Sequence, residues 1–103
     1  LRDVVAAAAH FCRDGGRVGL IHLPERLTDL LSTLRHFKLE PKRLCLVQPK
    51  PGVRPHRVLV EAQKLARPGL KVLAPFPIQG ADGNFSPEMV QVYQGKQLGA
   101  DVQ

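Results

Sequence analysis

The chain has 103 residues, of which 44% are hydrophobic, with no tryptophan and a formal net charge of +6. This length allows at most one domain with a modest core, and it does not allow a deep cleft of the chain's own. No apolar run approaches the ~20 residues of a membrane-spanning helix, so no membrane partner is expected.

The charge is distributed unevenly along the chain. Residues 1–34 balance acids against bases, residues 35–71 carry ten bases and two acids, and residues 72–103 have two more acids than bases. A base-rich middle third favours a polyanionic partner, most often a nucleic acid. A solvated surface that only aids solubility is the alternative.

The chain opens with a predicted helix over residues 4–12, without a start methionine or a lead-in strand. Gly15-Gly16 ends the helix, and residues 17–23 follow as a strand with apolar residues on both faces. Such a strand is typical of the interior of a parallel sheet covered by helices on each side. We therefore expect a missing part upstream of Leu1. We also expect an open edge on this strand, which would recruit a second copy into a homodimer or a strand exchange.

A helix and two further strands are predicted in the middle of the chain. Pro24 suits the first position of the helix, and leucines follow at helical spacing as far as Phe37. Residues 43–48 form a second buried strand, and the crossover connection makes it parallel to the first strand in one sheet. The proline-rich residues 49–55 cannot pair in a ladder, so residues 56–63 return as a third strand, antiparallel to the second. The predicted fold class is therefore α/β, with parallel strands closed by an antiparallel hairpin.

The last third of the chain is less regular. Residues 70–78 are predicted to be extended, but their two prolines confine them to an edge of the sheet. The Ser86-Pro87 pair predicts the start of a helix that runs through Tyr93. Residues 95–103 are predicted to form a flexible tail.

No catalytic or metal site is predicted in this chain. The four histidines and two cysteines lack the spacing of zinc ligands, and no nucleophile has a recognisable base beside it. Cys12 and Cys45 lie in apolar segments without CxxC spacing, which favours reduced core thiols and a cytoplasmic location. Gly15-Gly16 is not a phosphate loop, because it follows a helix and precedes a strand.

The candidate binding residues gather where the predicted strands end, since ligands of open α/β sheets bind beyond the carboxyl ends of the strands. His22 lies at that end of the first strand, and Arg26 opens the helix after it. A capped helix with a surface arginine is the alternative for this pair. The loop after the second strand carries cations on a proline-stiffened frame, which suits phosphate contacts. The predicted nucleic-acid-binding residues are Arg26, Lys42, Arg43, Lys50, Arg54, His56 and Arg57, and His22 is predicted at the substrate edge.

Five segments carry a resemblance to a known family through their order and spacing. They are GRVGLIHLPERL (16–27), LEPKRL (39–44), QPKPG (48–52), RVLVEA (57–62) and DGNFSPE (82–88). Together they resemble the C-terminal half of a class I S-adenosylmethionine-dependent methyltransferase. More narrowly, they resemble the bacterial enzymes that methylate N6 of the adenosine beside the anticodon of a valine tRNA. The resemblance covers about residues 1–90.

The resemblance implies a partial Rossmann-like methyltransferase fold over residues 1–94, with S-adenosylmethionine as cofactor of the complete enzyme and tRNA as substrate. Such enzymes bind the methyl donor on a Gly-rich loop and hold the adenine with an Asn-Pro-Pro-Tyr motif, and this sequence has neither. The chain alone is therefore expected to bind no cofactor and to be inactive. Two other classes stay open: a small, non-catalytic basic RNA-binding module, and a structural or dimerisation fragment.

Overall fold

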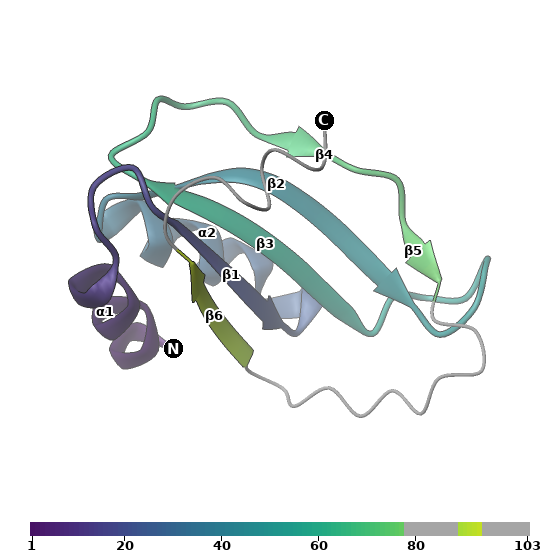
Figure 1. The fold of residues 1–103 in the computed structure, drawn as a ribbon. Coiled ribbons are helices and arrows are strands. Elements are labelled where there is room, and N and C mark those ends of the chain that lie inside the picture. The colour runs from purple at the N-terminus through teal and green to yellow at the C-terminus, as the bar shows by residue number, and fades with distance from the viewer. Residues whose placement is uncertain (78–88, 94–103) are drawn as a thin grey trace.

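The computed structural model describes residues 1–77 and, without their side chains, residues 89–93. Within these ranges, six strands form one sheet and two α-helices pack against it (Figure 1). The helices are α1 (Arg2–Phe11) and α2 (Leu27–His36), and a short 3-10 helix, η1 (Pro24–Arg26), leads into α2. The strands are β1 (Arg17–His22), β2 (Leu39–Gln48), β3 (Arg57–Lys64), β4 (Lys71–Val72), β5 (Phe76–Pro77) and β6 (Met89–Tyr93).

Strand β3 lies between β1 and β2 and pairs antiparallel with both. The order across the sheet is β4, β2, β3, β1, β6, and β5 also pairs with β2. Strands β1 and β2 therefore run in the same direction in one sheet, as predicted, although they are not neighbours. Strands β4 and β5 pair in parallel with the outer edge of β2. The α/β fold class, the antiparallel hairpin and the edge position of the extended segment after residue 70 are confirmed.

The lateral edge of β1 differs from the prediction. Strand β6 pairs antiparallel with β1, so the edge that was expected to be open is occupied by the chain itself. The predicted helix through Tyr93 is therefore wrong. Val90, Val92 and Tyr93 have side chains that favour strands, and tertiary pairing overrides the local helix-start signal of Ser86-Pro87. A homodimer or strand exchange stays a prediction, and through this edge it would require β6 to leave β1.

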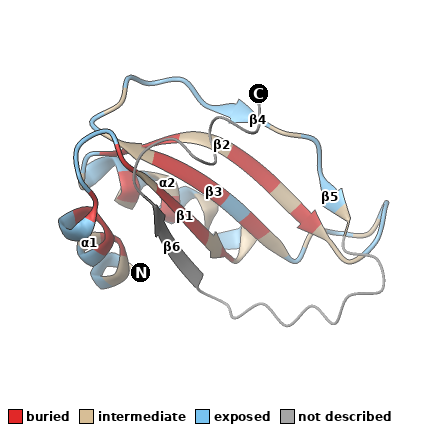
Figure 2. Cartoon of the chain, in the orientation of Figure 1, coloured by how far each residue is buried: buried red, intermediate tan, exposed pale blue. Residues whose placement is uncertain are grey.

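The core lies between both helices and one face of the sheet (Figure 2). Strands β1, β2 and β3 contribute alternate residues to it, as expected when one face of a sheet is buried. Helix α2 follows β1 and leads to β2, and α1 contacts α2. In the described part of the chain both helices therefore cover the same face, and the prediction of helices on each side of β1 is wrong. The largest fully buried side chains are Val5, Cys12, Val18, Leu30, Leu34, Leu39, Val58 and Val60.

The two cysteines are buried free thiols, as predicted, but the predicted core position is confirmed for Cys12 and wrong for Cys45. Cys12 follows α1 and belongs to the core, whereas Cys45 lies on the opposite face of β2, where its Sγ donates to the carbonyl oxygen of Ala74 at 3.3 Å. Burial raises the pKa of both thiols. A raised pKa leaves less thiolate at neutral pH, so both cysteines are poor nucleophiles with a structural role.

A buried carboxylate connects the three central strands on the sheet face away from the helices. Glu61 of β3 is 7% exposed. Its Oε1 accepts a hydrogen bond from Nε of Arg43 on β2 at 2.7 Å and one from Nη1 of Arg17 on β1 at 3.1 Å. Each strand contributes one charged group, so this cluster fixes the lateral order of β1, β3 and β2. The sequence pattern gave no indication of it.

Replacing Glu61 by alanine is expected to lower the free energy of unfolding by about 2–3 kcal/mol, because two partly buried guanidinium groups would each lose the carboxylate that they share. Urea unfolding followed by circular dichroism measures this. The matched control is Asp29→Ala, which removes the exposed ion pair between Arg26 and Asp29 and should cost less than about 0.5 kcal/mol. Equal losses for the two variants would contradict a structural role of Glu61.

Candidate nucleic-acid interface

Strand β3 pairs antiparallel with both β1 and β2, so these two strands run in the same direction. Their carboxyl ends therefore lie at the same end of the sheet, which we call its carboxyl edge. His22 of β1 pairs with Val58, and Val47 of β2 pairs with Arg57. The loop of residues 49–56 therefore lies beside the segment that follows β1. Backbone hydrogen bonds shape this loop, from Val53 to Lys50 at 3.1 Å and from His56 to Val47 at 3.0 Å.

A hollow of about 370 Å³ lies between the two segments, and we call it the edge hollow. It is lined by Leu23, Glu25, Arg54, Pro55, His56 and Arg57. Leu23 and Pro55 are half-buried and apolar, whereas the other four side chains are charged or polar. This size lies at the low end of the range of small-molecule sites, which suits one ring-sized group more than a whole cofactor.

The lining of the edge hollow is mainly basic. Arg54 and His56 are exposed and therefore reachable from solvent. Arg57 is half-buried, and its Nη1 donates to the carbonyl oxygen of His56 at 2.7 Å. This bond holds the guanidinium against the base of the loop. Glu25 supplies the one carboxylate of the lining, so the hollow offers both a hydrogen-bond acceptor and donors for an anion.

The structure brings together only part of the predicted binding set. Arg54, His56 and Arg57 line the edge hollow, and Lys50 is exposed in the same loop. Arg26 follows Glu25 in η1, but it forms an exposed ion pair with Asp29 at 3.0 Å and does not line the hollow.

The other predicted residues lie elsewhere. Lys42 and Arg43 are near the opposite end of β2, where Lys42 Nζ donates to the carbonyl oxygen of Arg67 at 2.8 Å and Arg43 pairs with Glu61. His22 does sit at the end of β1, but it is 6% exposed and shares the core face with Leu20. Lys42, Arg43 and His22 are therefore not positioned to contact a ligand in the edge hollow.

Glu25 is the charged lining residue that the sequence analysis did not predict, and the apolar Leu23 and Pro55 were not predicted either. The position of Glu25 after Pro24, in the first turn of a helix, is one that the helix dipole favours for an acid. Its position just after the carboxyl end of a predicted strand, next to Arg26, could have identified it as a candidate binding residue. In the described part of the chain, no three His, Cys, Asp or Glu side chains are grouped as metal ligands. No helix there has the length and apolar character needed to cross a bilayer.

Among solved structures, the chain is similar to a predicted O-methyltransferase, protein Atu636 from Agrobacterium tumefaciens. The TM-score is 0.66 at 25% sequence identity, and the match covers 84% of this chain and 41% of that chain. This chain therefore spans about two-fifths of the length of that neighbour. No family model and no curated protein matches the sequence. The likeness supports a methyltransferase fold, in agreement with the broader part of the resemblance.

Proposed function

We propose that this chain forms the RNA-binding side of an S-adenosylmethionine-dependent methyltransferase. The observation that carries this proposal is the edge hollow, where cations on a proline-stiffened loop lie beside the carboxyl end of β1. Ligands of open α/β sheets bind at such an edge. The similarity to a predicted O-methyltransferase supports the reaction class.

The proposed target is N6 of an adenine in tRNA, which is the substrate that the resemblance implies. The lining suits a base with an exocyclic amino group, because the Glu25 carboxylate can accept its hydrogen bond while Leu23 and Pro55 contact its face. Lys50 and Arg54 would contact the neighbouring phosphates. A hydroxyl acceptor is the second candidate, favoured by the description of the structural neighbour as an O-methyltransferase. Analysis of the methylated nucleoside by mass spectrometry distinguishes the two.

The described residues do not fit the cofactor itself. S-adenosylmethionine carries a sulfonium cation, and Arg54, His56 and Arg57 line the edge hollow with like charge. The sequence also has no Gly-rich loop that follows a strand. The methyl donor would thus bind to another part of the complete enzyme. A tRNA substrate and two buried free thiols support a cytoplasmic location.

A non-catalytic RNA-binding module is the alternative, since it would use the same cations. An open reading frame directly upstream that encodes a Gly-rich loop and an Asn-Pro-Pro-Tyr motif would favour the methyltransferase. A complete and unrelated gene upstream would favour the module.

Titration calorimetry of the chain with S-adenosylmethionine is expected to show no binding, because Arg54, His56 and Arg57 outnumber the Glu25 carboxylate in the edge hollow and repel the sulfonium. Micromolar affinity would contradict the proposed division between cofactor side and RNA side.

Replacing Lys50 and Arg54 together by glutamate is expected to weaken tRNA binding at least tenfold at low salt. Each lost phosphate contact lowers the number of counterions that the RNA releases on binding. The slope of log affinity against log salt should fall by about two. Fluorescence anisotropy with a tRNA transcript measures both. Arg57 is left unchanged because it is half-buried and bonded to the backbone of His56.

The matched control replaces Arg2 and Arg13 by glutamate, which changes the net charge equally at two exposed positions near α1. This variant should keep affinity within about twofold, and circular dichroism should show that both proteins fold. Equal losses in the two variants would mean that charge acts as a diffuse field and that the loop does not guide RNA.

A further inference from the structure

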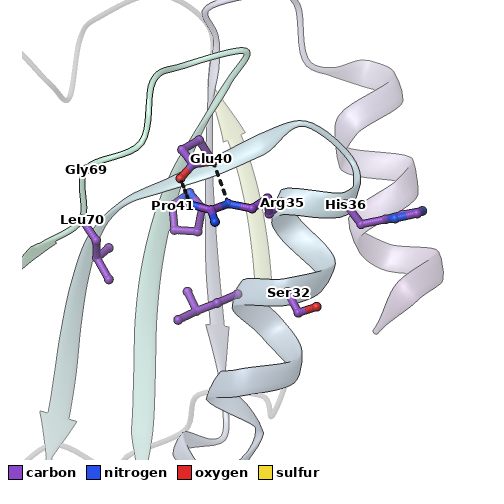
Figure 3. A pocket seen from close by; sticks show the side chains of 8 residues that line it. Ser32, Arg35, His36, Glu40, Pro41, Gly69 and Leu70 are labelled. Carbon is purple, nitrogen blue, oxygen red and sulfur yellow. Dashed lines mark hydrogen bonds and ion pairs between the residues drawn. The ribbon is translucent and has the colours of Figure 1, made fainter.

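A second hollow, of about 570 Å³, lies near the opposite end of β2 (Figure 3). We call it the Arg35 hollow, and it lies between the last turns of α2, the start of β2 and the segment that follows β3. Its lining includes Leu31, Ser32, Arg35, Glu40, Pro41 and Leu70. None of its lining residues belongs to the edge hollow.

A two-point ion pair fixes a guanidinium in this hollow. Arg35 reaches from α2 to β2, where its Nε donates to Oε1 of Glu40 at 3.2 Å and its Nη2 donates to Oε2 at 2.5 Å (Figure 3). The side chain of Glu40 is 11% exposed, whereas that of Arg35 is 66% exposed. The hydrogen bond to Glu40 raises the pKa of Arg35. Among residues 1–77, Glu40 is the one acceptor that binds the Arg35 side chain, so further N–H groups of this exposed guanidinium are available to a ligand.

The backbone around this hollow is unusual in three places. The register between β2 and β3 shifts between Pro41 and Arg43, which is a β-bulge. Lys38 and Leu65 have positive φ angles of 67° and 60°, and the N–H of Leu65 donates to the carbonyl oxygen of Lys38 at 2.9 Å. Bulges and left-handed residues with side chains are enriched at functional sites. These backbone features do not indicate which ligand would bind. The charges around the hollow indicate its chemical class.

The surroundings of the Arg35 hollow are basic. Lys42 Nζ lies 3.5 Å from the position of a Cβ on Gly69, a lining residue, and Lys38 occupies the turn between α2 and β2. The one acid of the lining is Glu40, whose charge is balanced by Arg35. The remaining local charge is therefore positive, which attracts an anion.

From these observations we infer that the Arg35 hollow is a second phosphate-binding site, which holds the RNA backbone at a distance from the edge hollow. This inference rests on the proposed function for the identity of the polyanion, but it uses a separate set of residues. Strand β2 advances from Glu40, in the second hollow, to Val47, beside Arg57, which at ~3.3 Å per residue is about 23 Å. A stacked strand rises ~3.4 Å per nucleotide, so about six or seven nucleotides connect the two sites.

The test uses two single variants and two RNA lengths. Ser32→Asp places a carboxylate one turn before Arg35 on the exposed side of α2, where it attracts the guanidinium at i,i+3 spacing and repels a phosphate. Lys38→Asn removes a charge at a position with positive φ, a conformation that asparagine tolerates well. The second variant keeps the test valid if the first destabilises the fold. The RNA probes are oligo(U) of about twenty and about four nucleotides, a range that brackets known single-strand site sizes.

Each variant is expected to weaken binding of the long probe about threefold or more and to lower its salt slope by about one. Binding of the short probe, which cannot span both sites, should stay within about twofold. Ala7→Asp, at an exposed position of α1, adds the same charge outside both hollows and should leave both probes unaffected. Unchanged affinity and slope for the long probe, or equal losses for both probes, would overturn the second site.

The test of the second site can be distinguished from the test of the proposed function. If the double change at Lys50 and Arg54 weakens long-probe binding while Ser32→Asp and Lys38→Asn do not, the second site is refuted and the proposed function stands. If none of these variants affects binding, both are refuted.

Discussion

The pairing of β3 with both β1 and β2 determines where every candidate residue lies. Because β3 is antiparallel to each neighbour, it starts beside the carboxyl ends of β1 and β2 and places Val58 opposite His22 and Arg57 opposite Val47. The loop before β3 must then lie next to the segment after β1, and the edge hollow is the space between them. A shift of one residue in β3 would turn Val58 and Val60 out of the core and bring Glu61 into it. The site therefore depends on the register that the core imposes.

The same register separates structural cations from available ones. Glu61 lies on the face away from the helices and is neutralised by Arg17 and Arg43, so these two arginines stabilise the order of the strands. Lys50 and Arg54 stand in a loop outside the ladder and form no ion pair with any described residue. The basic middle third of the chain is thus divided between one structural cluster and the surroundings of two surface hollows at opposite ends of β2. A count of charges along the sequence cannot make this division, because alternate residues of a strand face opposite sides.

Local patterns predicted the elements that local physics controls. Helical spacing of leucines identified α2, and prolines identified the loop after β2 and the edge segment after residue 70. The antiparallel return of β3 followed from the absence of a helix between two strands. Long-range pairing was not predictable in this way: neither the insertion of β3 between β1 and β2 nor the pairing of β6 with β1 leaves a local signal. The loop after β2 does lie beside the carboxyl end of β1, as predicted, whereas the Glu61 cluster and the Arg35–Glu40 pair became apparent only in the assembled sheet.

The central claim is that RNA binds at the carboxyl edge of the sheet. Amide chemical-shift mapping of the isotope-labelled chain, titrated with a tRNA transcript, tests it most directly, since each backbone N–H reports its own surroundings. The account predicts the largest changes over residues 23–26 and 50–57, a second group over residues 32–42, and small changes in α1. Largest changes in α1, or changes of similar size over all elements, would contradict it.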